Sequence, residues 1–270
     1  MVMPMVEMRA IPQEFYPNPM PVVILAGGKG SRIAEVGEGL PKPLMKIGDK
    51  PLLGHIIDIY AGYGFKEFII AGGYKVEKIA EYLFSFGETT HEPNTWQSNA
   101  RGLQIHLEDT GLETKTGGRL WKLRKLLRNR PFMVTYGDGL SDVRIDSLIH
   151  HHRQAGRAAT VTAVHPKPRF GAMSIGNTDR VLSFSEKNDY LDGWINGGFF
   201  VFHPDVLLLI NGDETSLEYD VLPKLVLMEQ LTAYRHTGFW ECVDTLRDLD
   251  YLNEYYKREG PVWISGKTVL

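Results

Sequence analysis

Short apolar runs alternate along the first half of the chain with longer segments in which apolar residues recur every three or four positions. The first run, PVVILA, is rich in β-branched residues and ends in glycines, as a buried parallel strand does when it leads into a loop. Similar runs predict strands at residues 21–26, 65–73, 103–109, 132–138 and 158–165. Helical spacing predicts helices at residues 51–64, 75–86, 117–127 and 144–156. This alternation favours an α/β fold with a Rossmann-like, mostly parallel sheet flanked by helices on both faces.

The second half has a different pattern. Strand-like pieces at residues 171–176, 180–186 and 195–203 follow one another closely, which predicts a β-rich, partly antiparallel portion continuous with the sheet. Near the end, TLRDLDYLNEYYKR has apolar and aromatic residues at helical spacing. It predicts a helix at residues 245–258 that packs back on the domain or on a neighbouring subunit.

The pattern also suggests domain boundaries. The first twenty residues hold four prolines, two acidic residues and no long apolar run, so we expect residues 1–20 to be an N-terminal extension rather than a signal peptide or membrane span. Residues 21–270 are then one domain. A net charge of -3 disfavours a nucleic-acid partner, and the single cysteine agrees with a reducing, cytoplasmic location. Phosphate binding must therefore come from a few positioned groups.

A glycine-rich turn follows the first strand and ends in an arginine, Leu25-Ala26-Gly27-Gly28-Lys29-Gly30-Ser31-Arg32. Without Cβ atoms, its backbone N–H groups can approach a base and phosphates closely. The turn lacks the GK[ST] ending of a P-loop, and its spacing does not match the dinucleotide fingerprint. It is a candidate NTP cradle, with a purely structural turn as the alternative.

Lys42 lies between Pro41 and Pro43, which hold the backbone extended and stiff. A stiff lysine suits a phosphate clamp, and an exposed lysine in a proline turn is the alternative reading. Together with Arg32 it could neutralise charge on the β- and γ-phosphates as pyrophosphate leaves.

Two aspartates are candidate metal ligands. Asp138 follows a strand within Tyr136-Gly137-Asp138-Gly139, at the sheet edge where ligands of open α/β folds bind. Asp244 lies in the GFWECVDT segment, and a pair of carboxylates plus substrate phosphate is a usual Mg²⁺ ligand set. Asp138 as a simple turn former is the alternative.

Two further groups pair glycine with polar residues. In Thr116-Gly117-Gly118-Arg119 the glycines open a helix, so free N–H groups and the arginine could face a base or phosphate, or the glycines could be a helix cap. In the β-rich half, Glu186 and Asn196 are candidate acceptors for hexose hydroxyls and Lys187 a candidate for the sugar phosphate, with ordinary surface residues as the alternative.

The order of these motifs resembles the sugar-nucleotide pyrophosphorylase family. LAGGKGSR, PKP, TGGRL, YGDG, RFGA, SFSEK, INGGFFVF and GFWECVDTLRD follow one another as in that family, from about Val22 to about Tyr256, and TGGR with GFW…VDTLRD is similar to its cytidylyl branch. The chain departs from the pattern with Ser31 for a usual threonine, Asn188 for a usual proline, and a shorter segment at about 85–102.

The resemblance implies a nucleotide-diphospho-sugar transferase fold and assigns roles to matching residues. It implies catalytic roles for Arg32, Lys42 and Lys187, and Mg²⁺ binding by Asp138 and Asp244. It implies nucleotide binding by Leu25, Ala26, Gly27, Gly28, Gly30, Ser31, Thr116, Gly117, Arg119 and Gly137. It implies binding of the sugar phosphate by Gly171, Glu186, Lys187, Asn196 and Gly197.

The implied activity is transfer of a cytidylyl group from CTP to glucose 1-phosphate, giving CDP-glucose for polysaccharide (O-antigen) biosynthesis, by a homo-oligomeric cytoplasmic enzyme. A pyrophosphorylase of the same fold that uses UTP or dTTP is one alternative, because base choice depends on a few backbone contacts. A regulatory protein that keeps the fold without the activity is the other, although joint retention of Arg32, Lys42, Asp138, Lys187 and Asp244 argues against it.

Overall fold

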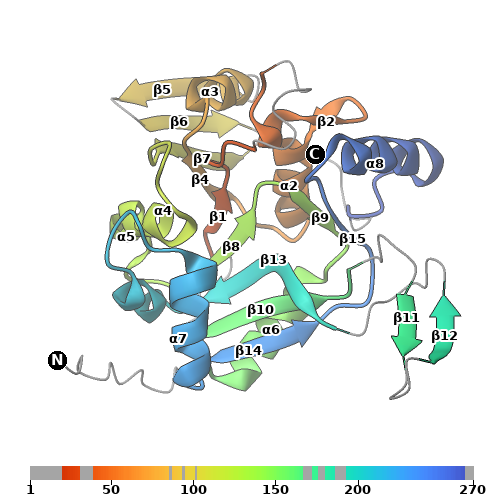
Figure 1. The fold of residues 1–270 in the computed structure, drawn as a ribbon. Coiled ribbons are helices and arrows are strands. Elements are labelled where there is room, and N and C mark those ends of the chain that lie inside the picture. The colour runs from red at the N-terminus through yellow and green to blue at the C-terminus, as the bar shows by residue number, and fades with distance from the viewer. Residues whose placement is uncertain are drawn as a thin grey trace.

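The computed structural model describes residues 20–30, 39–84, 87–92, 95–100, 102–166, 172–175, 180–185 and 193–264. Within these residues, nine strands form one sheet in the order β14-β10-β13-β8-β1-β4-β7-β6-β5 (Figure 1). Seven of the nine run in one direction, and only β13 and β6 run against them. The strands are β1 (Val22–Leu25), β4 (Glu67–Gly72), β5 (Glu88–Glu92), β6 (Thr95–Ala100), β7 (Leu103–Asp109), β8 (Phe132–Tyr136), β10 (Ala159–Val164), β13 (Ile195–Phe202) and β14 (Leu231–Arg235).

Both faces of the sheet are buried, because residues of β1 alternate between two apolar clusters. Val22 and Ile24 belong to one cluster, whereas Val23 and Leu25 belong to the other. The first cluster is covered by α2 (Leu52–Ala61), α3 (Val76–Phe84), α6 (Ile145–Ala155) and α8 (Leu246–Glu259). The second is covered by α4 (Thr116–Lys122), α5 (Arg124–Leu127), α7 (Leu222–Leu227) and the short helices η3 (Pro204–Leu209) and η4 (Leu217–Val221). The expected α/β fold is confirmed.

Some elements differ from the prediction. The helix expected at 117–127 is two helices, α4 and α5, which meet at Leu123. The strands β5, β6 and β14 were not predicted: ETTHE and TWQSNA hold few apolar residues, and the half-exposed LTAYR is short, so none carries a strong hydrophobic pattern. β11 (Ala172–Ile175) and β12 (Val181–Ser185) pair with each other in a separate ribbon, whereas β13 continues the main sheet as expected.

Small elements lie at the edge of the sheet where the parallel strands end. β2 (Lys46–Ile47) and β3 (Lys50–Pro51) form a short hairpin after η2 (Lys42–Leu44). β9 (Gly139–Ser141) pairs antiparallel with β15 (Trp240–Cys242), with Gly139 opposite Cys242. This ladder brings a segment near the C-terminus beside the end of β8. No helix in the described part of the chain is long and apolar enough to span a bilayer.

The C-terminal helix α8 begins at a capping box directly after Asp244. The Thr245 hydroxyl accepts a hydrogen bond from Asp248 N at 3.3 Å, and the Asp248 carboxylate accepts from Thr245 N at 2.8 Å and Asp244 N at 3.0 Å. The Asp248 carboxylate thus pairs the backbone N–H groups of Asp244 and Thr245, which also fixes the backbone of Asp244.

We therefore expect Thr245→Ala to lower the free energy of unfolding by about 1 kcal/mol, the usual value of an N-cap. Thr245→Ser retains the hydroxyl and serves as the control, with little change expected. Urea denaturation followed by circular dichroism measures both, and equal stability of the two variants would contradict the importance of the cap.

Candidate active site

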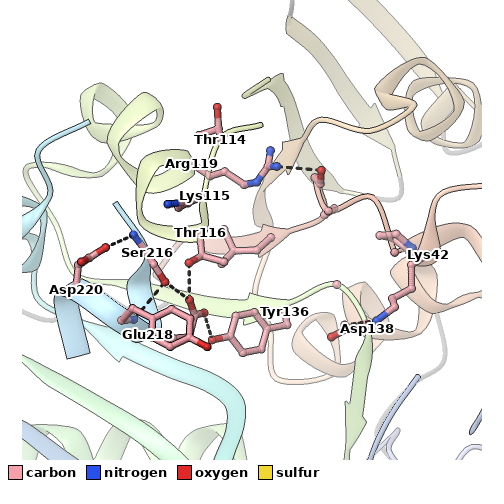
Figure 2. A pocket seen from close by; sticks show the side chains of 18 residues that line it. Lys42, Thr114, Lys115, Thr116, Arg119, Tyr136, Asp138, Ser216, Glu218 and Asp220 are labelled. Atoms are coloured by element: carbon pink, nitrogen blue, oxygen red, sulfur yellow. Dashed lines mark hydrogen bonds and ion pairs between the residues drawn. The ribbon is translucent and has the colours of Figure 1, made fainter. Parts of the chain in front are cut away.

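A cavity of about 650 Å³ opens at the carboxyl ends of the central strands. Its lining comes from the loops after β1 and β8, from the start of α4, and from η4, as Figure 2 shows. Lys42, Asp138 and eight of the predicted nucleotide-binding residues line it, the eight being Leu25, Ala26, Gly27, Gly28, Gly30, Thr116, Arg119 and Gly137. The structure therefore brings most of the described candidate residues into one place.

The glycine turn after β1 is tied to the loop after β4. Ala26 N donates to Ala71 O at 3.0 Å, and Tyr74 N donates to Gly27 O at 3.1 Å. Among the described residues, and apart from its two chain neighbours, no heavy atom lies within 4 Å of the place where a Cβ of Gly28 would stand, so this part of the backbone is open to a ligand. Ser31 and Arg32, the predicted end of the turn, lie outside the described residues.

Arg119 is a buried cross-brace behind this turn. Its guanidinium donates to Gly72 O at 2.8 Å, to Thr110 Oγ1 at 2.5 Å, to Gly111 O at 3.0 Å and to Gly27 O at 2.9 Å. It thus joins the ends of β1, β4 and β7, and burial lowers its pKa. A Cβ at Gly27 would overlap this guanidinium, so the glycine is needed for the brace.

The glycines of the TGGR segment have a packing role in this structure. A Cβ at Gly117 would lie 2.8 Å from Thr215 O, and one at Gly118 would overlap the backbone of Asp213. Lys115 N and Gly118 N donate to the carbonyl oxygens of Asp213 and Thr215 at 2.9 Å each. Gly117 does not line the cavity; it lets the loop before η4 lie against α4.

Lys42 joins the two predicted metal ligands. Its ammonium lies 2.9 Å from Asp138 Oδ2 and 2.8 Å from Asp244 Oδ1. Asp138 follows β8, and Asp244 follows β15, whose pairing with β9 brings the two together; Val243 N donates to Asp138 O at 2.9 Å. Burial alone would lower the pKa of Lys42, but the charges and hydrogen bonds of the two carboxylates outweigh it and raise the pKa.

The predicted sugar side is described only in part. Asn196 is exposed at the start of β13, where its Nδ2 donates to the Tyr136 hydroxyl at 3.1 Å. Gly197 O accepts from Trp240 Nε1 at 2.8 Å, which ties β13 to β15. Gly171, Glu186 and Lys187 lie outside the described residues.

Several cavity residues were not predicted from the sequence: Thr114, Lys115, Tyr136, Ser216, Glu218, Tyr219 and Asp220. Ser216 N-caps η4 by accepting from Tyr219 N, so a serine before LEYDVLP was a usable signal for a helix start. Nothing local marked η4 as part of the site, because its contacts are with residues about a hundred positions earlier.

The described residues hold no group of three or more histidine, cysteine or carboxylate side chains able to hold a metal ion. The pair Asp138 and Asp244 remains, and two carboxylates suffice for Mg²⁺ when substrate phosphates and water supply the other ligands. That both carboxylates converge on one cation, Lys42, shows that the pair can face a positive charge.

A glycine turn, a cavity at the strand ends and two acidic residues around a lysine together define a nucleotide-processing site of an open α/β fold. Comparison with known families agrees: residues 21–259 match the nucleotidyl transferase model, and the chain belongs to that family. The family predicted from the motif order is confirmed.

Two curated relatives are similar along nearly their whole length. The chain is 39% identical to the probable glucose-1-phosphate cytidylyltransferase of Bacillus subtilis, over 90% of this chain and 99% of that protein. It is 39% identical to the glucose-1-phosphate cytidylyltransferase of Salmonella typhimurium, over 90% of this chain and 98% of that protein. Among solved structures, HddC of Yersinia pseudotuberculosis complexed with GMP-PN has the same fold, with a TM-score of 0.67 at 22% identity, over 88% of this chain and 99% of that one.

The ion pairs of Lys42 predict a stability effect. Lys42→Met leaves two facing carboxylates without their cation, so we expect the free energy of unfolding to fall by about 1–3 kcal/mol at neutral pH. Because the pKa of Lys42 is raised, the contribution is present below the ordinary lysine pKa and is lost as the pH rises through the raised value.

The exposed Lys46 offers the matched control, Lys46→Met, which removes an equal charge four residues away. Denaturant unfolding at several pH values measures both variants. If Lys42→Met proves as stable as Lys46→Met at neutral pH, the ion pairs contribute nothing.

Proposed function

We propose that this protein transfers a cytidylyl group from CTP to glucose 1-phosphate, giving CDP-glucose and pyrophosphate. The observation that carries the proposal is the meeting of Lys42, Asp138 and Asp244 at the rim of a cavity lined by the glycine turn. The 39% identity to glucose-1-phosphate cytidylyltransferases over nearly their whole length supports the choice of substrates.

The nucleotide is proposed to lie over the turn formed by Leu25, Ala26, Gly27, Gly28 and Gly30, with its base toward α4. Backbone N–H groups of a glycine turn can donate hydrogen bonds to phosphate oxygens without steric hindrance. Arg119 supports this arrangement by holding the turn in place, and its positive charge favours an anionic ligand. Thr116 and Gly137 border the same cavity.

The proposed reaction requires the site to bring together two anions, glucose 1-phosphate and CTP. An oxygen of the glucose 1-phosphate attacks the α-phosphorus of CTP in line, a new P–O bond forms, and the bond from the α-phosphorus to the bridging oxygen breaks as pyrophosphate leaves with the electron pair. The nucleophile is already an anion, so no general base is needed. Lys42, with Arg32 and Lys187 as further candidates, neutralises the accumulating charge.

Nucleotidyl transfer is generally metal-dependent, and we propose Mg²⁺ as the metal, held by Asp138 and Asp244. Hard carboxylate oxygens suit this ion. When bound, Mg²⁺ neutralises charge on the reacting phosphates. Lys42, which contacts both carboxylates in the structure described here, is then available for a phosphate oxygen.

Several expectations from the sequence stay predictions. These are the sugar-phosphate contacts of Gly171, Glu186, Lys187, Asn196 and Gly197, the role of Ser31, the separate extension at residues 1–20, the homo-oligomer and the cytoplasmic location.

The proposed function predicts a nucleotide preference. With Mg²⁺ and glucose 1-phosphate, we expect pyrophosphate release with CTP at least about tenfold faster than with UTP, dTTP, ATP or GTP, a discrimination typical of a site that pairs with one base. A coupled pyrophosphate assay at equal nucleotide concentrations measures this. Preference for another base would refute the cytidylyl assignment, and no turnover with any sugar phosphate would favour a non-catalytic protein.

The metal site predicts a second effect. Asp244→Asn keeps the shape and an acceptor oxygen but removes a charge, so the Mg²⁺ concentration for half-maximal activity should rise about tenfold or more. Asp250→Asn, at an exposed position of α8, is the control and should leave the magnesium dependence unchanged. An unchanged magnesium titration for Asp244→Asn would remove this residue from the metal site.

A further inference from the structure

Glu218, a carboxylate, lies in the wall of a cavity that is proposed to hold phosphates. It belongs to η4 and has no role in the reaction as described above. A carboxylate repels phosphate, so its presence needs another explanation. Three hydroxyl groups donate hydrogen bonds to the Glu218 carboxylate and partly explain its position: Thr116 Oγ1 at 2.6 Å, Ser216 Oγ at 2.9 Å and Tyr136 OH at 2.5 Å (Figure 2).

The direction of these hydrogen bonds is determined by proton counting. Tyr136 has a single hydroxyl proton, and the ionised carboxylate of Glu218 can only accept, so the proton points to Glu218. The Tyr136 oxygen is thereby left as an acceptor.

That acceptor fixes the side-chain amide of Asn196. Asn196 Nδ2 donates to the Tyr136 oxygen at 3.1 Å, while Asn196 Oδ1 accepts from Gly198 N at 2.9 Å. Both ends of the amide are therefore assigned, and a flipped amide would place two donors against each other at Gly198. Within the part of the chain that the structure describes, one N–H of the exposed amide and one lone pair of its oxygen stay available for hydroxyl groups of a ligand.

The hydrogen bonds thus run in one direction, from Asn196 through Tyr136 to Glu218. We propose that Glu218 is a positioning residue for the acceptor sugar: through Tyr136 it holds the Asn196 amide in the orientation that binds hydroxyl groups of the hexose phosphate. This rests on the proposed function, in which Asn196 belongs to the sugar side. Glu218 lies at the η4 end of the cavity and Lys42 at the end near the glycine turn. In the proposal this separation of charge directs the hydroxyl groups of the ligands to the first end and their phosphates to the second.

The nucleotide is the less favoured target of Glu218. The Thr116 hydroxyl, on the nucleotide side, already donates to Glu218 and accepts from Leu217 N at 2.8 Å, so this contact serves to anchor η4 to α4. The Asn196 amide, in contrast, retains free hydrogen-bonding capacity of both kinds.

The test is Glu218→Gln, measured by steady-state kinetics with each substrate varied in turn. Glutamine offers one oxygen to three hydroxyl donors, so not all three hydrogen bonds can form. The Tyr136 hydroxyl is then free to point its proton elsewhere, and its oxygen no longer holds the Asn196 amide in one orientation. We expect the KM for glucose 1-phosphate to rise about tenfold while the KM for CTP changes less than about twofold, as for a lost charge-assisted contact on one substrate.

Tyr136→Phe breaks the same chain at the next link without changing charge and should give the same split between the two KM values. The double variant should be no worse than either single variant, because both remove one orienting chain. Glu214→Gln is the matched control: it removes a carboxylate from the loop just before η4, where the Glu214 side chain is 81% exposed and forms an ion pair with Lys115. Thermal unfolding of all four proteins checks that each is folded.

Equal rises in both KM values, a rise for CTP alone, or additive effects in the double variant would overturn the inference; a rise for CTP alone would assign Glu218 to the nucleotide. Failure of the proposed function is a separate result, seen when the wild type makes no product from CTP and glucose 1-phosphate. In that case calorimetric titration with glucose 1-phosphate decides. Weaker binding by Glu218→Gln than by the wild type supports the inference. Equal binding by the two proteins, or no binding by the wild type, refutes it.

Discussion

The arrangement of the active-site edge of the sheet depends on the contact of the Lys42 ammonium with Asp138 and Asp244. Two partly buried carboxylates repel each other, and bringing them together requires a cation between them. The three groups lie on different elements. Lys42 is the first residue of η2, Asp138 follows β8, and Asp244 lies in the turn between β15 and α8. The β9–β15 ladder, the Trp240 bond to β13 and the cap of α8 all hold these elements together.

The same contact explains how one site can accept anions and a metal ion. The lysine supplies the positive charge that the carboxylates need in the free protein, so the site is folded before any ligand binds. The proposed divalent ion would be held by the same two carboxylates, and the lysine charge would then be available for phosphate. The cavity is therefore cationic at the glycine turn and Lys42, and anionic at η4, where Glu218 and Asp220 lie.

The sequence predicted those parts of the fold whose pattern reflects burial on both faces. The run VVIL is typical of a central strand, and the residues that follow parallel strands meet at one edge of the sheet, which is why the sequence indicated Asp138 and the glycine turn. The edge strand β5 and its neighbour β6 have no such pattern, since a polar strand near the margin of a sheet is selected by its partner rather than by its own sequence. Glu218 was missed for a related reason: its partners Thr116 and Tyr136 are separated from it by about a hundred residues, and no local spacing encodes that contact.

The glycines of the two motifs have packing roles that the sequence did not indicate. Their missing Cβ atoms were expected to admit a ligand, and Gly28 is indeed open, but Gly27 makes room for the Arg119 guanidinium, and Gly117 and Gly118 make room for the loop before η4. Arg119 in turn places its charge on carbonyl and hydroxyl oxygens of three strand ends rather than on a carboxylate partner. A guanidinium does not lose its proton under such conditions, so its charge is not cancelled and contributes to the field in the cavity. The turn is therefore held in shape by the same side chain that makes it attractive to an anionic ligand, so that any substitution at Gly27 that displaces Arg119 alters both properties at once.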